Sequence, residues 1–265
     1  MSTTGPTPST AAPSTTATAA QAQADHASIP GPADPQLVER LALANRILYD
    51  QGVVDGFGHV SVRHHRSDAH FLLARNMAPG LVTAADILTF DLDGNALDAA
   101  GRRVYLERFI HGEIYRARPD VRAVVHSHSP NVIPFAATRT PLRPIFHMSG
   151  FLGRGSALFE IRDVAGETDL LIRDARLGRA LAASLGPHAA VLMRGHGSTV
   201  VGASLEQAVY RAIYAETNAR LQAQAMTLGD VTYLTETEAA LAAATNDTQL
   251  ARTWELWERR VSAGR

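Results

Sequence analysis

Three histidines in this chain lie in settings that suit metal ligation. His126 and His128 are two apart at the end of the apolar run "AVVHSHSP", and alternate residues of a strand project to the same side. Two imidazoles presented together are a common pair of ligands for one ion. His196 lies in "RGHGS", where a glycine on each side leaves the ring unobstructed. Each motif has a plain alternative, because a polar strand end or a turn histidine needs no ion.

A carboxylate completes the candidate set. Glu107 and His111 are four residues apart in a predicted helix, so they would share a face of it; a surface pair is the alternative. Three histidines with a carboxylate beside them would suit zinc, manganese, iron or cobalt. Such a set leaves coordination positions for water and substrate.

The composition excludes several other chemistries. The 265 residues contain no cysteine, and reading along the chain finds no lysine, so all 25 basic side chains are arginines. Without cysteine there are no disulfides, thiolate ligands or thiol nucleophiles. Without lysine a Schiff-base aldolase, a pyridoxal-phosphate enzyme and a phosphate-loop NTPase are excluded. An enolate or carbanion would then need another electrophile, and a metal ion is the obvious one.

Charge and hydropathy limit the partners and the compartment. A formal net charge of −1 provides no basic field for a polyanion, so nucleic acid and anionic membranes are not expected partners. No apolar stretch approaches the ~20 residues that span a bilayer. Residues 1–33 are rich in Ala, Thr, Ser and Pro, and the first basic residue is Arg40. We therefore expect a disordered tail, not a secretory signal, and a cytoplasmic protein.

The elements that must position these residues follow from periodicity and turn residues. The mixture predicts one α/β domain over 34–265, with a largely antiparallel sheet and helices on its faces. A capping box at Ser204 and Gln207 opens one helix, and the last helices carry Trp254 and Trp257. Expected strands are 59–65, 70–75, 121–128, 157–161 and two within 188–202, with a hairpin over 87–97; expected helices are 34–52, 106–119, 129–138, 169–186 and 204–229.

The run "GHVSVR … LERFIHGEIYRARPDVRAVVHSHSP … VLMRGHGS" resembles the class II aldolase/adducin family over roughly residues 37–226. The resemblance implies a three-layer α/β/α domain with a central, mostly antiparallel sheet. It implies that His126, His128 and His196 bind a divalent metal and that Glu107 is the acid/base carboxylate. It further implies a homotetramer with active sites between subunits.

The sequence departs from the sugar-phosphate members of that family where they hold phosphate. His59 in "GHVS" stands in the place of an asparagine, and residues 78–81 read "APGL" where a threonine–glycine loop is expected. Tyr105 and Leu106 replace a serine pair before the glutamate. Because three small polar donors are gone, we do not expect a phosphorylated substrate.

The replacements suit a carboxylate on a flat ring. The guanidinium fork of Arg75 matches a carboxylate bidentately, and the alternative is a surface ion pair. His59, Tyr105 and Phe57 would form an aromatic wall, with ordinary packing as the alternative. His147 in "IFHMSGFLG" is a candidate proton donor, unless it serves core or interface packing.

This pattern is similar to a branch of the family that decarboxylates hydroxy-aromatic or ring-derived dicarboxylates. That branch includes 3,4-dihydroxyphthalate decarboxylase and 3-hydroxy-2-methylpyridine-4,5-dicarboxylate decarboxylase. The resemblance implies a carboxy-lyase of aromatic catabolism that uses Mn²⁺, Zn²⁺ or Fe²⁺. Glu107, as general acid, should then be desolvated and keep its proton near neutral pH. The alternatives are a retro-aldolase acting on a non-phosphorylated hydroxy-acid, an iron-dependent oxygenase, and a non-catalytic adducin-like module.

Overall fold

A seven-stranded sheet forms the centre of the computed structural model, which describes residues 1, 30–153 and 155–263. The strand order is β3-β2-β1-β4-β7-β6-β5, and every neighbouring pair is antiparallel except β5 with β6. The predicted α/β fold with a mostly antiparallel sheet is confirmed. The strands are β1 (His59–Arg63), β2 (His70–Ala74), β3 (Ile87–Asp91), β4 (Ala123–Ser127), β5 (Ala157–Phe159), β6 (Ala190–Met193) and β7 (Gly197–Gly202).

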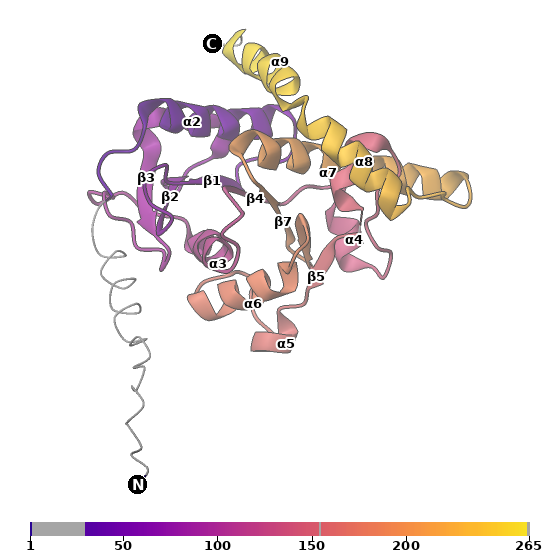
Figure 1. The fold of residues 1–265 in the computed structure, drawn as a ribbon, viewed down its shortest axis with the longest axis horizontal. Helices are drawn as coiled ribbons and strands as arrows, with labels where there is room; N and C mark the ends of the chain where they lie inside the picture. The colour runs from indigo at the N-terminus through magenta and orange to yellow at the C-terminus, as the bar shows by residue number, and fades with distance from the viewer. Residues whose placement is uncertain (2–29, 154, 264–265) are drawn as a thin grey trace.

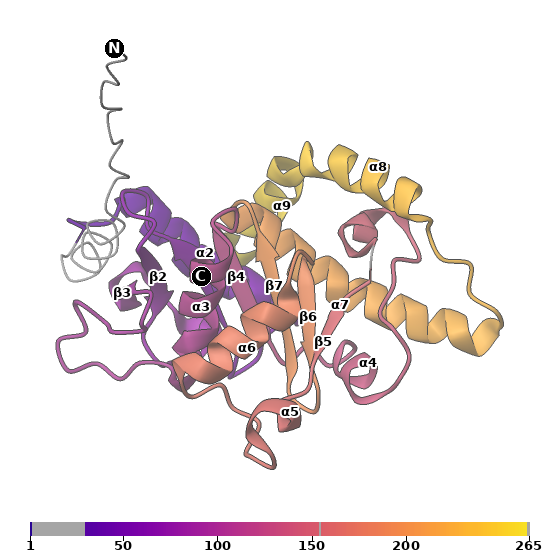
Figure 2. The ribbon, with the colours of Figure 1, turned by 60° about the horizontal axis from the view of Figure 1, so that its bottom comes forward.

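Helices cover both faces of the sheet, which gives the three layers that were expected (Figure 1). One apolar core joins α2, α7 and α9 to the sheet, and a second core joins α3 and α6 to its other face. Figure 2 shows α3 and α6 in front of the strands and α7 behind them. The helices are α2 (Pro35–Asp50), α3 (Phe109–Ala117), α4 (Ile133–Ala137), α5 (Arg162–Ala165), α6 (Ala175–Leu185), α7 (Leu205–Leu228), α8 (Glu236–Asp247) and α9 (Leu250–Ala263), with short 3₁₀ turns η1 (Pro79–Leu81), η2 (Ala84–Asp86), η3 (Leu106–Arg108) and η4 (His147–Leu152).

The apolar run before the histidine pair is explained by the position of β4. This strand lies in the middle of the sheet, between β1 and β7. Val125 belongs to the core under α7, whereas Val124 belongs to the core under α3 and α6. Because successive side chains alternate between the faces, a strand covered on both sides needs apolar residues throughout. His126 is itself fully buried, so the histidine pair begins inside the covered part of the strand.

The helix predicted over 106–119 is wrong at its start. The chain first makes the 3₁₀ turn η3, in which Glu107 has the non-helical angles φ −92° and ψ 19°, and α3 begins only at Phe109. Glu107 and His111 therefore do not share a face of one regular helix. The physical reason is tertiary, since the Glu107 carboxylate is bonded across the site to a backbone N–H, as shown below.

Two other predicted boundaries also shift. The helix predicted from residue 169 begins at Ala175, because the Asp174 side chain caps it by accepting from the Leu177 N–H at 2.8 Å. The hairpin predicted over 87–97 reduces to β3, a turn, and an isolated bridge between Phe90 and Ala96. In both places a local turn competes with the longer periodic pattern.

The remaining sequence predictions concern the start of α7, the two tryptophans, the N-terminal tail and membrane spans. The Ser204 side chain accepts from the Gln207 N–H as predicted, although the Gln207 side chain accepts from Ala203, one residue earlier than in a capping box. Trp254 and Trp257 are buried in α9. The predicted tail, 1–33, lies outside the described residues except for Met1 and 30–33. Within the described residues, every helix is too short or too polar to cross a membrane.

Candidate metal centre

Two strand ends and one turn bring the three histidines together. His126 lies at the end of β4 and His128 just beyond it, while His196 lies in the turn between β6 and β7. Pairing of Ser127 with Ser198 sets the register of β4 against β7. The approach depends on Gly197, because a Cβ at that position would lie 2.1 Å from the Ser127 carbonyl oxygen. Only glycine lets the turn place His196 against His128.

Glu107 joins the histidines from the opposite side of the cluster. Its Oε1 accepts a hydrogen bond from the Ile172 backbone N–H at 2.9 Å. Its Oε2 lies 3.6 Å from the Nε2 of His126 and 3.4 Å from the Nε2 of His196. One oxygen is thus held by the backbone, and the other faces the imidazoles.

The donor set fits a divalent cation. One ligand atom from each of Glu107, His126, His128 and His196 lies within 4.8 Å of all the others, and the Nε2 atoms of His128 and His196 are 3.1 Å apart. Ligand atoms ~2.0–2.2 Å from a tetrahedral ion lie about 3.3 Å from one another. The Nε2 of His126 is buried and has no hydrogen-bond partner in the described part of the chain. An ion at the centre would satisfy this atom.

The outer ring nitrogens are bonded in a way that turns lone pairs toward the centre. His196 Nδ1 lies 3.0 Å from the Leu170 carbonyl oxygen, so it must carry the proton and donate. His126 Nδ1 lies 3.4 Å from Thr199 Oγ1, and that hydroxyl donates to the Met193 sulfur. The Thr199 oxygen is therefore free to accept from His126. In both rings the Nε2 keeps its lone pair, as a metal ligand requires.

The segment containing Leu170 and Ile172, whose role the sequence did not indicate, holds two of the four site residues. The Leu170 carbonyl orients His196, and the Ile172 N–H holds Glu107. Leu170 has φ 70°, which is strained for a branched side chain, and such strain persists where the surroundings impose it. The sequence placed this segment inside a helix. Asp174, a good N-cap residue, was the signal that the helix starts later.

Opposing effects act on the pKa of Glu107. Burial raises it, whereas protonated imidazoles at His126 and His196 would lower it to about 2. Burial lowers the pKa of His126 well below its ordinary value, so its ring is neutral. The predicted desolvation of Glu107 agrees with its burial, and its role as a general acid stays a prediction. An ionised carboxylate beside neutral imidazoles is the protonation state that binds a cation.

Two of the predicted substrate residues lie beside the cluster. His59 is buried on β1, and its ring centroid is 5.0 Å from that of His126. The Tyr105 ring lies 4.7 Å from His59, and its hydroxyl donates to the Met77 carbonyl at 2.6 Å. Burial raises the pKa of Tyr105 to about 12. Tyr105 therefore forms a wall with its ring and has its hydroxyl engaged elsewhere.

The other predicted residues have partners outside the cluster. Arg75 Nε donates to Asp86 at 2.7 Å, which matches the ion-pair alternative, although its other nitrogens are not engaged by that bond. His147 opens η4 and is exposed; its ring contacts Phe146. The exposed Phe57 ring lies 6.3 Å from His128.

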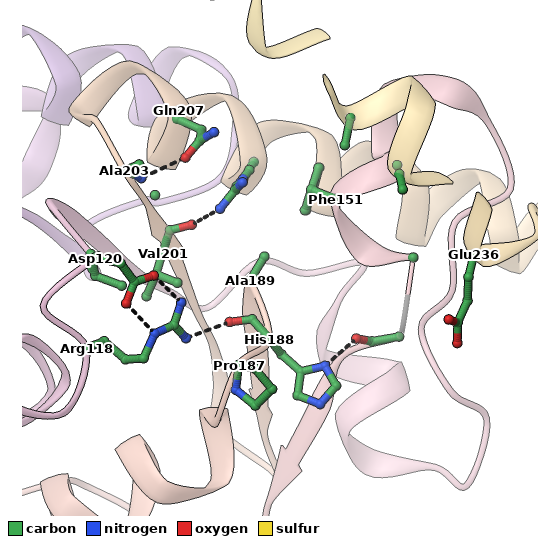
Figure 3. A pocket seen from close by; sticks show the side chains of 18 of the residues that line it. Arg118, Asp120, Phe151, Pro187, His188, Ala189, Val201, Ala203, Gln207 and Glu236 are labelled. Atoms are coloured by element: carbon green, nitrogen blue, oxygen red, sulfur yellow. Dashed lines mark hydrogen bonds and ion pairs between the residues drawn. The ribbon is translucent and has the colours of Figure 1, made fainter. Parts of the chain in front are cut away.

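A cavity of about 740 Å³ lies at the other end of the sheet (Figure 3). It is bordered by Arg118 and Asp120 before β4, by His188 before β6, and by Arg211 on α7. None of the four residues of the metal centre lines it. This cavity therefore does not lie at the place where the ligand atoms converge.

Comparison with known proteins identifies the family and agrees with the fold. Residues 39–223 match the family described as the Class II Aldolase and Adducin N-terminal domain. The chain is 39% identical over 242 residues to decarboxylase tropJ of Talaromyces stipitatus, which covers 82% of this chain and 91% of that one. It is 34% identical over 201 residues to 3,4-dihydroxyphthalate decarboxylase of Arthrobacter keyseri, covering 72% and 79%. The structure of L-fuculose 1-phosphate aldolase from Glaciozyma antarctica PI12 superposes with a TM-score of 0.71 at 25% identity, covering 91% and 98%.

Proposed function

Because the chain belongs to the class II aldolase and adducin family, we propose that it is a divalent-metal-dependent decarboxylase of a hydroxy-aromatic or ring-derived dicarboxylate. The observation that carries this proposal is the convergence of four ligand atoms from Glu107, His126, His128 and His196. Two of its relatives are decarboxylases by name. They favour loss of CO₂ over aldol cleavage, which is the reaction named for the structural neighbour.

The three imidazoles and Glu107 would hold the ion, and Mn²⁺, Zn²⁺ and Fe²⁺ all accept such ligands. Bound there, the ion supplies a Lewis acid that stabilises negative charge on a substrate oxygen. Glu107 lies at the edge of the cluster, with one oxygen on Ile172 and the other facing His126 and His196. It is the carboxylate placed to handle a proton.

Glu107 assists protonation of the ring carbon that bears the leaving carboxylate. Glu107 itself, or a water molecule that it orients, would supply this proton. When the carbon–carbon bond breaks, CO₂ departs and the bonding electrons return to the substrate's conjugated system. The proton gained at carbon replaces the carboxylate, and the donor recovers a proton from solvent, so atoms and charge balance.

The substrate ring would lie along the wall made by His59 and Tyr105. Arg75, whose Nε is held by Asp86, would bind a second carboxylate with its remaining N–H groups. His147 stays a candidate proton donor. Because His147 is exposed on η4 in the single chain, this role suits a site completed between subunits.

A homotetramer with active sites between subunits is part of the proposal, together with cytoplasmic location and a role in aromatic catabolism. Light scattering on the purified chain would give a mass close to four times 28.4 kDa. A monomer with full activity would contradict sites shared between subunits.

A CO₂-release assay tests the reaction. The full chain would be reconstituted with Mn²⁺, Zn²⁺ or Fe²⁺ and offered ortho-hydroxylated aromatic and pyridine dicarboxylates. We expect metal-dependent CO₂ release, loss of turnover with retained metal in Glu107→Gln, and normal turnover in the control Glu206→Gln, whose carboxylate pairs with Arg40. An aldehyde or pyruvate-like product without CO₂ would favour the aldolase alternative.

A further inference from the structure

A buried chain of hydrogen bonds runs away from the metal centre between β1 and α3. His59 Nδ1 lies 2.7 Å from His111 Nε2, and His111 Nδ1 lies 2.6 Å from Ser61 Oγ. Ser61 Oγ in turn lies 2.8 Å from the Tyr115 hydroxyl. All four residues are at most 4% exposed, so water does not compete for these bonds. Arg63 fixes the far end, with its guanidinium 4.7 Å from the Tyr115 ring centre and one nitrogen donating to the Tyr115 carbonyl.

The network permits only two arrangements of its protons. The contact between His59 Nδ1 and His111 Nε2 needs one donor and one acceptor, and a neutral imidazole supplies one N–H and one acceptor nitrogen. In the first arrangement Tyr115 donates to Ser61, Ser61 donates to His111, and His111 donates to His59. In the second arrangement every one of these bonds is reversed.

The Tyr115 hydroxyl decides between the two arrangements. It is buried, and it bonds to Ser61 Oγ at 2.8 Å. In the first arrangement the phenol hydrogen goes to Ser61, and every group is satisfied. In the second arrangement Ser61 donates to Tyr115, and the phenol hydrogen finds no acceptor among the described residues. A buried hydroxyl without an acceptor is unfavourable, so the first arrangement is selected.

We propose that Tyr115, Ser61 and His111 form a relay that fixes the tautomer of His59, so that His59 presents an Nε2–H donor to the substrate beside the metal ligands. With Nδ1 accepting from His111, the proton of His59 lies on Nε2. The His59 ring centroid lies 5.0 Å from that of His126, which places the ring beside the metal ligands. His59 is then a binding residue, and the other three are positioning residues.

This inference rests on the proposed function for the identity of the ligand. A fixed N–H donor in a water-poor wall recognises a carboxylate or phenolate oxygen and disfavours a group that can only donate. A protonated ring nitrogen in the substrate would find no acceptor there. The relay therefore favours binding of a carboxylate or phenolate oxygen of a hydroxylated dicarboxylate at His59.

The direct test is the tautomer itself. Magic-angle-spinning NMR on the full chain, labelled with ¹⁵N-histidine and loaded with diamagnetic Zn²⁺, distinguishes Nδ1–H from Nε2–H rings. The chain has 11 histidines, and the signals of His59 and His111 are assigned by their loss in His59→Gln and His111→Asn. We expect Nε2–H for both rings. Nδ1–H at His59 would overturn the relay.

A variant tests whether the relay causes this preference. Ser61→Ala removes the link between Tyr115 and His111, so both tautomers should appear at His59 and His111. Ser149→Ala removes a buried serine outside the relay, whose hydroxyl bonds to Asn218, and should leave the His59 spectrum unchanged. An unaltered His59 tautomer in Ser61→Ala would show that the relay does not set it.

Kinetics tests the donor role separately. His59→Gln keeps an N–H donor near the Nε2 position, whereas His59→Leu removes it. We expect KM for a dicarboxylate substrate to rise about tenfold or more in His59→Leu, and to rise clearly less in His59→Gln. Equal losses in the two variants would overturn the donor role. Absence of CO₂ release from the wild type would overturn the proposed function instead, because the NMR result does not depend on turnover.

Discussion

Both ends of the central sheet carry histidine and charged side chains, but the two ends differ in how far the polar atoms of these side chains are hydrogen-bonded. At the end of β4, the Nε2 atoms of His126, His128 and His196 converge, and their protons are held on the far side of at least two rings. Among the described residues, these lone pairs have no protein donor to satisfy them, apart from contacts within the cluster itself. Coordinating a cation is the chemistry that such an arrangement supports.

At the opposite end, the charged residues bond mainly to one another and to the backbone (Figure 3). Arg118 makes two bonds to Asp120, of 2.8 and 2.6 Å, and also donates to the Gly186 carbonyl. His188 Nδ1 bonds to the Gly155 carbonyl, and Arg211 donates to Val201 at the same site. The Nε of Arg211 is buried and has no partner among residues 30–153 and 155–263, but an N–H donor cannot ligate a cation.

The comparison indicates that convergence of unpaired lone pairs, and not the volume of a cavity, identifies the end of the sheet that can bind a cation. The cavity of about 740 Å³ has arginines and a histidine around it, yet most of their donors are already used. Substitutions at the two ends should therefore have unequal effects on metal binding. The following predictions run from the largest expected effect to the smallest.

Removing a ligand should abolish the centre. His126→Ala takes away the buried Nε2 that has no other partner in the described chain, so metal affinity should fall by more than the ~10–100-fold that loss of a supporting residue costs. Metal analysis after dialysis measures this directly. The control is His65→Ala, on the surface near Asp34. A His126→Ala protein that keeps stoichiometric metal would remove His126 from the ligand set.

Adding a methyl group at the closest backbone approach should destabilise the fold. The Cβ of Gly197→Ala would lie 2.1 Å from the Ser127 carbonyl oxygen, so β7 must shift, at a cost of about 3 kcal/mol. Thermal unfolding gives the change, and metal affinity should fall as His196 moves. Gly56→Ala is the matched control, because its Cβ meets nothing within 4 Å. Equal stability of the two variants would contradict the close approach.

Changing the residue that orients one ligand should weaken metal binding without abolishing it. Thr199→Val deletes the hydroxyl that accepts from His126 Nδ1, and the expected loss is about tenfold in metal affinity. Competition with a chromogenic chelator measures it. Thr199→Ser retains the hydroxyl and should bind like the wild type. If Val and Ser behave alike, the hydroxyl does not orient the ring.

A substitution at the opposite end of the sheet should have almost no effect on metal affinity in the same assay. His188→Ala loses one hydrogen bond to the Gly155 carbonyl, which should lower stability by about 1 kcal/mol or less. Metal affinity and CO₂ release should remain at wild-type levels. A loss of metal comparable to that of Thr199→Val would mean that the two ends are coupled, and the contrast between them would fail.

Much of this architecture could be predicted from the sequence because its signals are local. The apolar run before His126 indicated a covered strand, and the glycines around His196 indicated a tight turn. Asp34 capping α2 and Ser204 capping α7 are likewise local, since each side chain bonds to a backbone N–H two or three residues away. The fold class follows from the order of these elements.

The supports of the site could not be predicted because they are made across the fold. Leu170 and Ile172 act through backbone groups, and the carbonyl and N–H of a residue leave no trace in its side-chain type. The 3₁₀ geometry at Glu107 follows from the same bond to Ile172, which is 65 positions away. The partners of His59 and Ser61 on α3 are similarly distant, so periodicity alone could not reveal the relay.

The most direct measurement of the central claim is X-ray absorption at the zinc edge of the full chain loaded with one equivalent of Zn²⁺. The account predicts three imidazole nitrogens at ~2.0–2.1 Å together with oxygen ligands. It also predicts that the imidazole contribution decreases in His126→Ala and is unchanged in His188→Ala. A spectrum dominated by oxygen ligands, or one that His126→Ala leaves unaltered, would contradict a metal centre at the end of β4.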